Sequence, residues 1–183
     1  MRVISGELRG RKLASIRGRQ TRPTADRVRE ALFNIVGSRL AGAHVLDLFA
    51  GTGALGIEAL SRGAKMAVFV ENAAPALQVI QKNIASCRLQ SRATVLPLDI
   101  PRSLNGLAPY RGIFDLIFID PPYRCDLIRP TLEQLTQGGL PSPEALIVVE
   151  HDPSESVAPP PSWEIIDSRR YGQTRLSFLT SAC

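Results

Sequence analysis

The sequence predicts a single α/β domain built on a doubly wound, mostly parallel sheet. Its 183 residues suffice for one domain with one hydrophobic core and leave no room for a second large domain. Hydrophobic residues make up 44% of the chain and charged residues 21%, which is typical of folded rather than disordered proteins. From residue 44 onward, short apolar runs alternate with helical patterns, as they do in βαβ units.

Seven segments have the composition of β-strands. Most of the first five are nearly continuous apolar runs, as expected of strands that are covered on both faces. They span residues 44–49, 65–70, 94–98, 114–119 and 146–150. Residues 163–167 and 175–180 follow, and a turn at residues 171–173 can join them as an antiparallel pair. We therefore expect seven strands in a mostly parallel sheet with an antiparallel C-terminal strand.

Three helices are predicted between these strands, and each has a residue that marks one of its ends. They span residues 54–62, 75–87 and 127–137. Gly63 follows the first helix, Pro75 begins the second, and Gly138 follows the third. The proline-rich stretch of residues 153–161 is expected to be a loop.

A fourth helix is predicted before the first strand. Thr24 is placed to cap this helix, because apolar residues recur at helical spacing from there to about Leu40. The opposite face of the helix carries Arg27, with Arg29 or Glu30 beside it.

Positive charge is concentrated at the N-terminus. Residues 1–39 carry ten basic and three acidic side chains, a net charge of +7, although the whole chain carries only +5. Residues 1–22 are rich in glycine and arginine and indicate a short hairpin or arm. We expect residues 1–40 to form a basic arm and helix packed on a main domain of residues 41–183. Such an arm favours a polyanionic partner, although an incidental basic surface explains the charge equally well.

Several classes of protein are disfavoured by the composition. No apolar run approaches the ~18 residues of a membrane span, and the N-terminus has no apolar stretch of signal-peptide length, so we expect a cytoplasmic protein without a membrane partner. Cys87, Cys125 and Cys183 are dispersed and fit neither a disulfide framework nor a zinc site, so we expect reduced thiols and no metal. His44 and His151 lie at strand boundaries and are interpreted as structural.

A glycine-rich turn follows the first predicted strand. Gly51, Gly53 and Gly56 have the GxGxxG spacing, and a helix begins within this segment. Glycines allow a ligand to approach the backbone closely, and a helix start supplies unpaired N–H groups. Because nicotinamide enzymes and methyltransferases share this spacing, it does not by itself identify the ligand.

Acidic residues at three successive strand ends favour a nucleoside cofactor. Asp47 lies at the end of the first strand, and Glu71 follows the second, 20 residues after Gly51, where an acid can accept hydrogen bonds from both ribose hydroxyls. Asp99 closes the third strand and could accept a hydrogen bond from the adenine amino group. We expect Asp47, Gly51, Gly53, Glu71 and Asp99 to bind the cofactor.

The fourth predicted strand ends in Asp120-Pro121-Pro122-Tyr123. Ligands of open α/β sheets bind at such strand ends, and proline fixes the backbone without donating a hydrogen bond. The turn therefore offers the Asp120 carboxylate and the Pro121 carbonyl as acceptors, with the Tyr123 ring beside them. These groups suit the exocyclic amino group of a planar base that stacks on the tyrosine.

With these motifs, the chain resembles class I S-adenosylmethionine-dependent methyltransferases that modify exocyclic amines. More narrowly, it resembles the RsmD family of bacterial 16S rRNA guanine-N2 methyltransferases. The resembling segments are residues 1–6, 9–13, 22–34, 46–64, 118–123 and 172–173. The Arg-Pro-Thr segment at residues 22–24 is the most specific part, because the Asp-Pro-Pro-Tyr motif also occurs in enzymes that act on adenine N6 or protein glutamine.

The resemblance implies a Rossmann-like methyltransferase sheet, S-adenosylmethionine as cofactor, and a guanine of 16S rRNA in the small ribosomal subunit as substrate. Asp120, Pro121 and Tyr123 would then be catalytic. The residues expected to contact RNA are Arg9, Arg11, Arg22, Thr24 and Arg27. Nothing in the sequence indicates an obligate dimer, so we expect a monomer.

Three other functions compete with this interpretation. The chain could methylate adenine N6 of nucleic acid or protein glutamine, or it could be a basic RNA-binding assembly factor without turnover. A nicotinamide dehydrogenase fits less well because no residue pattern marks a site for a hydride acceptor. Cys125 lies close to the Asp-Pro-Pro-Tyr motif, but no neighbouring residue indicates an activated thiol.

Overall fold

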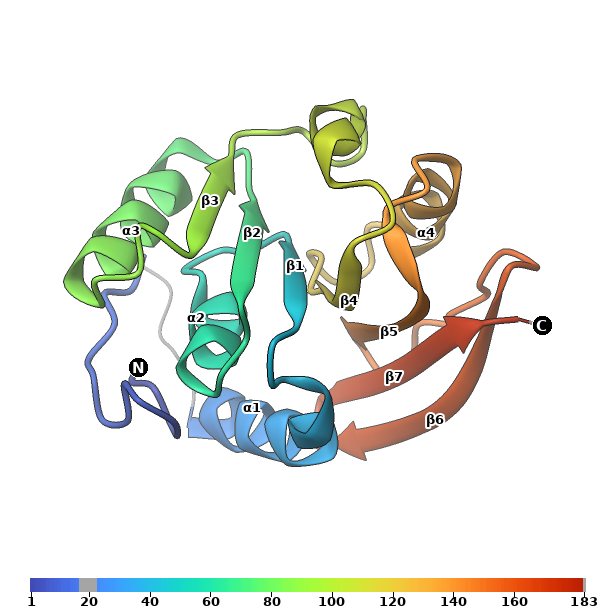
Figure 1. Cartoon of the computed structure of the whole chain (residues 1–183). Coiled ribbons are helices and arrows are strands. Elements are labelled where there is room, and N and C mark those ends of the chain that lie inside the picture. The colour runs from blue at the N-terminus through green and yellow to red at the C-terminus, as the bar shows by residue number, and fades with distance from the viewer. Residues whose placement is uncertain (17–22, 183) are drawn as a thin grey trace.

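The computed structural model describes residues 1–16 and 23–182, and its centre is a seven-stranded sheet (Figure 1). The strands are β1 (His44–Leu48), β2 (Met66–Val70), β3 (Ala93–Leu96), β4 (Phe114–Ile119), β5 (Pro141–His151), β6 (Trp163–Tyr171) and β7 (Thr174–Ser181). Their order in the sheet is β3-β2-β1-β4-β5-β7-β6. Neighbours among β1 to β5 are parallel, and β7 is antiparallel to β5 and β6. The predicted fold class is confirmed.

The helices are α1 (Pro23–Ile35), α2 (Ala54–Ser61), α3 (Ala74–Ser86) and α4 (Ile128–Gln137), with short 3-10 helices η1 (Gly37–Arg39) and η2 (Asn105–Tyr110). The predicted bounds of α2, α3 and α4 are correct to within one residue. The prediction for α1 is wrong at both ends. The helix begins at Pro23, before Thr24, because proline suits the first turn, and it stops at Ile35, before the weak helix formers Gly37 and Ser38.

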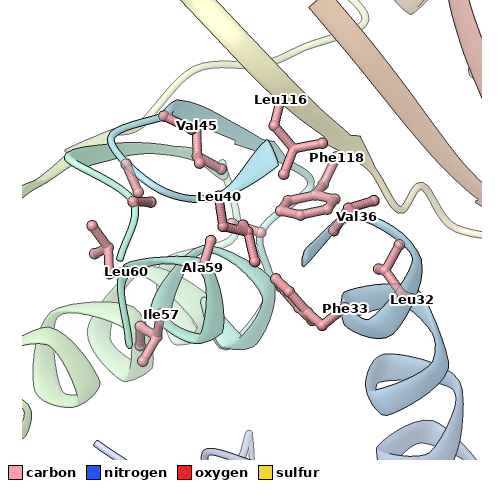
Figure 2. Packing of buried hydrophobic residues seen from close by; sticks show 14 of the residues in the cluster. Leu32, Phe33, Val36, Leu40, Val45, Ile57, Ala59, Leu60, Leu116 and Phe118 are labelled. Atoms are coloured by element: carbon pink, nitrogen blue, oxygen red, sulfur yellow. The ribbon is translucent and has the colours of Figure 1, made fainter. Parts of the chain in front are cut away.

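Helices cover both faces of the sheet, and alternate residues of each strand face opposite layers. Val45 of β1 belongs to a cluster with side chains of α1, α2 and α3, whereas its neighbour Leu46 packs in a second cluster with α4 and η2. Figure 2 shows the first cluster, in which the rings of Phe33 and Phe118 lie 5.6 Å apart between centroids. Both faces of the central strands β1, β2 and β4 are thus buried, as their continuous apolar sequences predicted. No helix in the described part of the chain is long and apolar enough to cross a bilayer.

Residues 1–16 form a small hairpin, which confirms that prediction for the described part of the arm. Arg2 and Lys12 form an antiparallel bridge, and the Val3 amide donates to the carbonyl of Arg11 at 2.9 Å. Val3 and Leu13 are buried in the first cluster. The hairpin is therefore packed on the domain rather than extended from it.

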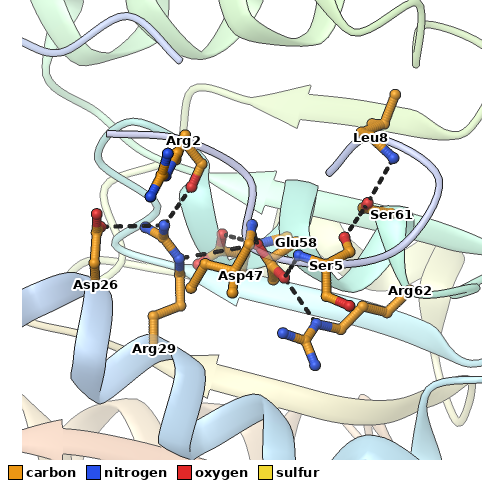
Figure 3. Close-up of polar contacts among 11 residues, drawn as sticks. Arg2, Ser5, Leu8, Asp26, Arg29, Asp47, Glu58, Ser61 and Arg62 are labelled. Atoms are coloured by element: carbon orange, nitrogen blue, oxygen red, sulfur yellow. Dashed lines mark hydrogen bonds and ion pairs between the residues drawn. The ribbon is translucent and has the colours of Figure 1, made fainter. Parts of the chain in front are cut away.

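Polar contacts fix the hairpin to helix α2 (Figure 3). The amides of Ile4 and Ser5 donate to the buried carboxylate of Glu58 at 2.8 and 3.0 Å. The Ser61 hydroxyl donates to the Ser5 carbonyl and accepts from the Leu8 amide. These bonds satisfy backbone groups that would otherwise be buried without partners.

Candidate functional site

A cavity of about 680 Å³ lies at the carboxyl ends of the parallel strands. Its walls come from the turn after β1, from Glu71 after β2, from residues 120–123 after β4, and from Glu150 near the end of β5. The chain runs outward from β1 through β2 to β3 and then returns to place β4 on the other side of β1. Open α/β sheets bind ligands at such a switch in strand order, and the volume suits a small molecule.

The glycine turn forms one wall of this cavity. Gly51 lines the cavity, whereas Gly53 is buried behind the wall at the N-terminus of α2. Gly53 has a φ of +76°, a left-handed conformation that side-chain-bearing residues seldom adopt. Sequence reasoning assigned both glycines to the cofactor, and the structure gives only Gly51 a surface on the cavity.

Asp47 connects the glycine turn to β1. The side chain is 1% exposed, and its Oδ2 accepts a hydrogen bond from the Gly56 amide at 2.9 Å. Burial, with a smaller contribution from the negative charge of Glu71, raises the pKa of Asp47, and the Gly56 hydrogen bond opposes the shift; the net pKa is about 7. Asp47 lines the cavity and also holds the turn that forms its wall.

Glu71 holds the same turn from the neighbouring strand. Its Oε2 accepts from the Gly51 amide at 3.0 Å, and its Oε1 accepts from the amides of Asn72 and Ala73 at 2.8 and 2.9 Å. Asp99, the third predicted acid, is exposed and does not line the cavity. Asp99 is connected to the site through the side chain of Asn72, whose Nδ2 donates to Asp99 Oδ1 at 3.3 Å.

The Asp-Pro-Pro-Tyr turn lines the same cavity as the glycine turn. The Asp120 amide donates to the Leu48 carbonyl at 3.4 Å, so the β1–β4 pairing continues to the first residue of the motif. Asp120, Pro121 and Tyr123 all line the cavity, with Pro121 buried and the Tyr123 side chain 37% exposed. The structure thus brings the three predicted catalytic residues together.

Glu150 is a residue of this wall that sequence reasoning missed. The Tyr123 hydroxyl donates to Glu150 Oε1 at 2.9 Å and lies 3.2 Å from Thr174 Oγ1. Burial raises the pKa of Glu150 and also that of Tyr123, whose ionisation the nearby Glu150 carboxylate further opposes. The sequence could have indicated Glu150 as a site residue, because it is another acid at the end of a predicted strand.

The residues expected to contact RNA are distributed unevenly. Arg9 and Arg27 are exposed and line a second hollow of about 360 Å³ beside Arg2. Arg11 is also exposed, and its guanidinium donates to the Ser86 carbonyl. Arg22 lies outside the described residues, and so does the side chain of Thr24.

The sequence placed either Arg29 or Glu30 beside Arg27 on the exposed face of α1; Glu30 lies there, whereas Arg29 is buried. It is 5% exposed, and it lines the large cavity rather than the protein surface. Its Nη2 donates to the Arg2 carbonyl at 2.6 Å and to Asp26 at 3.2 Å. These partners hold the arginine inside the protein.

The remaining candidates have no part in the cavity. His151 is buried, and its Nε2 lies 2.9 Å from the Ser177 hydroxyl, as expected of a structural histidine. Burial lowers the pKa of His151. Within residues 1–16 and 23–182, no group of three or more His, Cys, Asp or Glu side chains could hold a metal ion.

Comparisons with known proteins agree over nearly the whole chain. The family model described as "Conserved hypothetical protein 95" matches residues 1–180. "Putative rRNA methyltransferase YlbH" of Bacillus subtilis is 41% identical over 152 residues, which are 83% of this chain and 83% of that protein. "Ribosomal RNA small subunit methyltransferase D" of Escherichia coli K12 is 36% identical over 174 residues, 94% of this chain and 86% of that protein.

A solved structure shares the whole architecture. The structure of "Putative methyltransferase yhhF from Escherichia coli" has a TM-score of 0.85 and 36% sequence identity to this chain. The alignment covers 100% of this chain and 98% of the other.

Proposed function

Because the chain belongs to the "Conserved hypothetical protein 95" family, which is the RsmD family, we propose that it transfers a methyl group from S-adenosylmethionine to the N2 amino group of a guanine in 16S rRNA. The names of its relatives support methyl transfer to rRNA. The choice of an exocyclic amine is supported by the Asp-Pro-Pro-Tyr turn. The choice of guanine N2 is supported by the resemblance of the arm and of helix α1 to the corresponding segments of the RsmD family.

One observation carries the proposal: Asp120 and Pro121 line the same cavity as the glycine turn. The exocyclic nitrogen of guanine is a poor nucleophile because its lone pair is delocalised into the ring. Two acceptors, the Asp120 carboxylate and the Pro121 carbonyl, can bind its two N–H groups and orient the lone pair. The Asp120 carboxylate, or solvent, can then take the proton that the amine loses.

The cavity fits S-adenosylmethionine by its donors and acceptors. A carboxylate has about four acceptor positions, and three described amides use the oxygens of Glu71, which leaves room for a ribose hydroxyl. On the same side of the cavity as Glu71, Gly51 has no side chain, so the cofactor can approach the backbone closely there. When bound, S-adenosylmethionine supplies an electrophilic methyl group on a sulfonium.

The acceptor base must leave its helix to reach this site. The N2 amine lies on the base-pairing edge of guanine, so the nucleotide has to be unpaired or flipped into the cavity. The ring of Tyr123, held through its hydroxyl by Glu150, can stack on the base. Tyr123 therefore acts by binding the base rather than by moving a proton.

We further propose that residues 1–40 form a substrate-binding arm and helix on a methyltransferase domain of residues 41–183. The exposed Arg9, Arg11 and Arg27 support this division, because they place positive charge beside the domain. We propose that the monomer acts on a 30S assembly particle in the cytoplasm.

A methyl-transfer assay tests the proposed reaction. Small ribosomal subunits from cells that lack the protein are incubated with the purified protein and labelled S-adenosylmethionine, and the RNA is digested to nucleosides. We expect labelled N2-methylguanosine from 16S rRNA, with protein-free 16S rRNA as a parallel substrate. N6-methyladenosine or methylated glutamine would contradict the proposal, and so would RNA binding without binding of S-adenosylmethionine.

A further inference from the structure

One cation reaches the large cavity from helix α1. Among the described residues that line the cavity, Arg29 is the only basic side chain, and Asp47, Glu71, Asp120 and Glu150 are acidic. Figure 3 shows Arg29 between Asp26 and the backbone of Arg2, close to Glu58. A negatively charged ligand group in this cavity is therefore attracted to Arg29.

The guanidinium of Arg29 retains an unused donor. Its Nε is buried and has no hydrogen-bond partner within the described part of the chain. The nearest carboxylate oxygen, Glu58 Oε2, lies 4.0 Å away, and Glu58 already accepts from Ile4, Ser5 and Arg62. A buried donor without a partner is costly, and this cost supports a role that goes beyond stabilising the fold.

We propose that Arg29 binds the carboxylate of the methionine moiety of S-adenosylmethionine. This inference rests on the proposed function, which supplies the cofactor. The carboxylate is the cofactor's one anionic group, and Arg29 is the one basic side chain among the described residues that line the cavity. A guanidinium is the side chain best suited to bind a carboxylate with two hydrogen bonds.

A phosphate of the RNA backbone fits this arginine less well. Arg29 is 5% exposed, and Met1, Ser15 and Ile16 of the hairpin line the same cavity. A polymer backbone would have to displace these residues, whereas Arg9 and Arg27 are exposed to it directly. Arg29 therefore serves the small ligand, and the arginines around the second hollow remain for RNA.

Calorimetric titration with two ligands tests the inference. S-adenosylhomocysteine carries the carboxylate, and S-adenosyl-3-thiopropylamine is the same molecule without it. We expect the wild-type protein to bind the first ligand roughly 10- to 100-fold more tightly, as a charge-assisted pair allows. In Arg29→Gln this preference should fall to about threefold or less, with the affinity for adenosine unchanged.

Two further variants separate ligand binding from folding. Arg62→Gln removes the other arginine that contacts Glu58 but does not line the cavity, so it should keep the full preference. If Arg29→Gln does not fold, Arg29→Lys is used instead, because it preserves the charge. This variant should lose part of the preference for the ligand that carries the carboxylate. The inference fails if wild-type protein binds both ligands equally, or if the Arg29 variants weaken both equally. If wild-type protein binds neither ligand nor adenosine, the proposed function fails with it.

Discussion

Asp47 and Glu71 hold the backbone of the site through hydrogen bonds to amides of the glycine turn and helix α2, and Asp47 is the more buried of the two. Its carboxylate bonds the Gly56 amide inside the protein and is shielded from water. Such a group prefers its neutral form at a pH where an exposed aspartate is ionised. The fold therefore depends on pH through this residue.

The change Asp47→Asn should remove that dependence. The pKa of Asp47 is about 7 in the folded protein, compared with about 4 in an unfolded chain. Between these values the folded protein keeps a proton that the unfolded chain releases, so this group's contribution to stability falls as pH rises and levels off above pH 7. Asparagine keeps an acceptor for Gly56. Between pH 5 and pH 8, the free energy of unfolding of the variant, minus that of the wild-type protein, should therefore rise by about 2–3 kcal/mol.

Urea unfolding of both proteins at each pH measures this difference. A difference that stays constant from pH 5 to pH 8 would show that Asp47 is ionised in the fold throughout this range.

The sequence predicted single residues well where a strand end positions them. Asp120 and Glu71 follow apolar runs whose ends are easily recognised, and both face the cavity. Arg29 could not be predicted, because its burial depends on Arg2 and Glu58, which lie far from it in the chain. The contact between Tyr123 and Glu150 likewise requires β4 and β5 to be neighbours.

Secondary structure elements were predicted best where glycine or proline marks an end, as Gly63 does for α2. Strand β5 begins at Pro141, although the apolar run starts at residue 146, because its first residues are polar or proline and pair across a register shift. Strand β6 continues to Tyr171 through exposed polar residues at the sheet edge. Pairing with a neighbouring strand, rather than hydrophobicity, sets these lengths.

The docking of the hairpin on α2 can be tested at two glycines with similar backbones. Gly6 and Gly10 have φ values of +83° and +82°. A Cβ at Gly6 would lie 1.8 Å from the Ser61 carbonyl oxygen, whereas nothing lies within 4 Å of a Cβ at Gly10. Gly10→Ala should cost only backbone strain, about 1 kcal/mol. Gly6→Ala should cost roughly 2–4 kcal/mol, because the hairpin must move off the helix.

Hydrogen exchange locates this effect. The amides of Ile4, Ser5 and Leu8, which bond to α2, should lose protection in Gly6→Ala and keep it in Gly10→Ala. Equal protection in the two variants would contradict the docking described above.

For the whole molecule, we propose that a basic surface binds RNA and that the separate acidic cavity performs the chemistry. If Arg9 and Arg27 contact phosphates, Arg9→Gln with Arg27→Gln should lower the slope of log affinity for RNA against log salt by roughly 1.4 to 1.8. Arg129→Gln is the control, because this exposed arginine lies on α4, on the other face of the sheet, and pairs with Glu133. Binding measured from low to moderate salt gives the slope. An unchanged slope in the double variant would place RNA recognition elsewhere.

The central claim is that the cavity has two ends with different tasks, one for the cofactor near Glu71 and one for the acceptor base near Asp120. Titration of Asp120→Ala and Glu71→Ala with S-adenosylmethionine, beside their methyl-transfer rates, tests it most directly. Asp120→Ala should abolish turnover and keep cofactor affinity within a few fold of wild type, because we propose that Asp120 binds the acceptor base and not the cofactor. Glu71→Ala should chiefly weaken cofactor binding, by about tenfold or more, because it loses a charged acceptor. Equal loss of cofactor affinity in the two variants would contradict the assignment of the two ends.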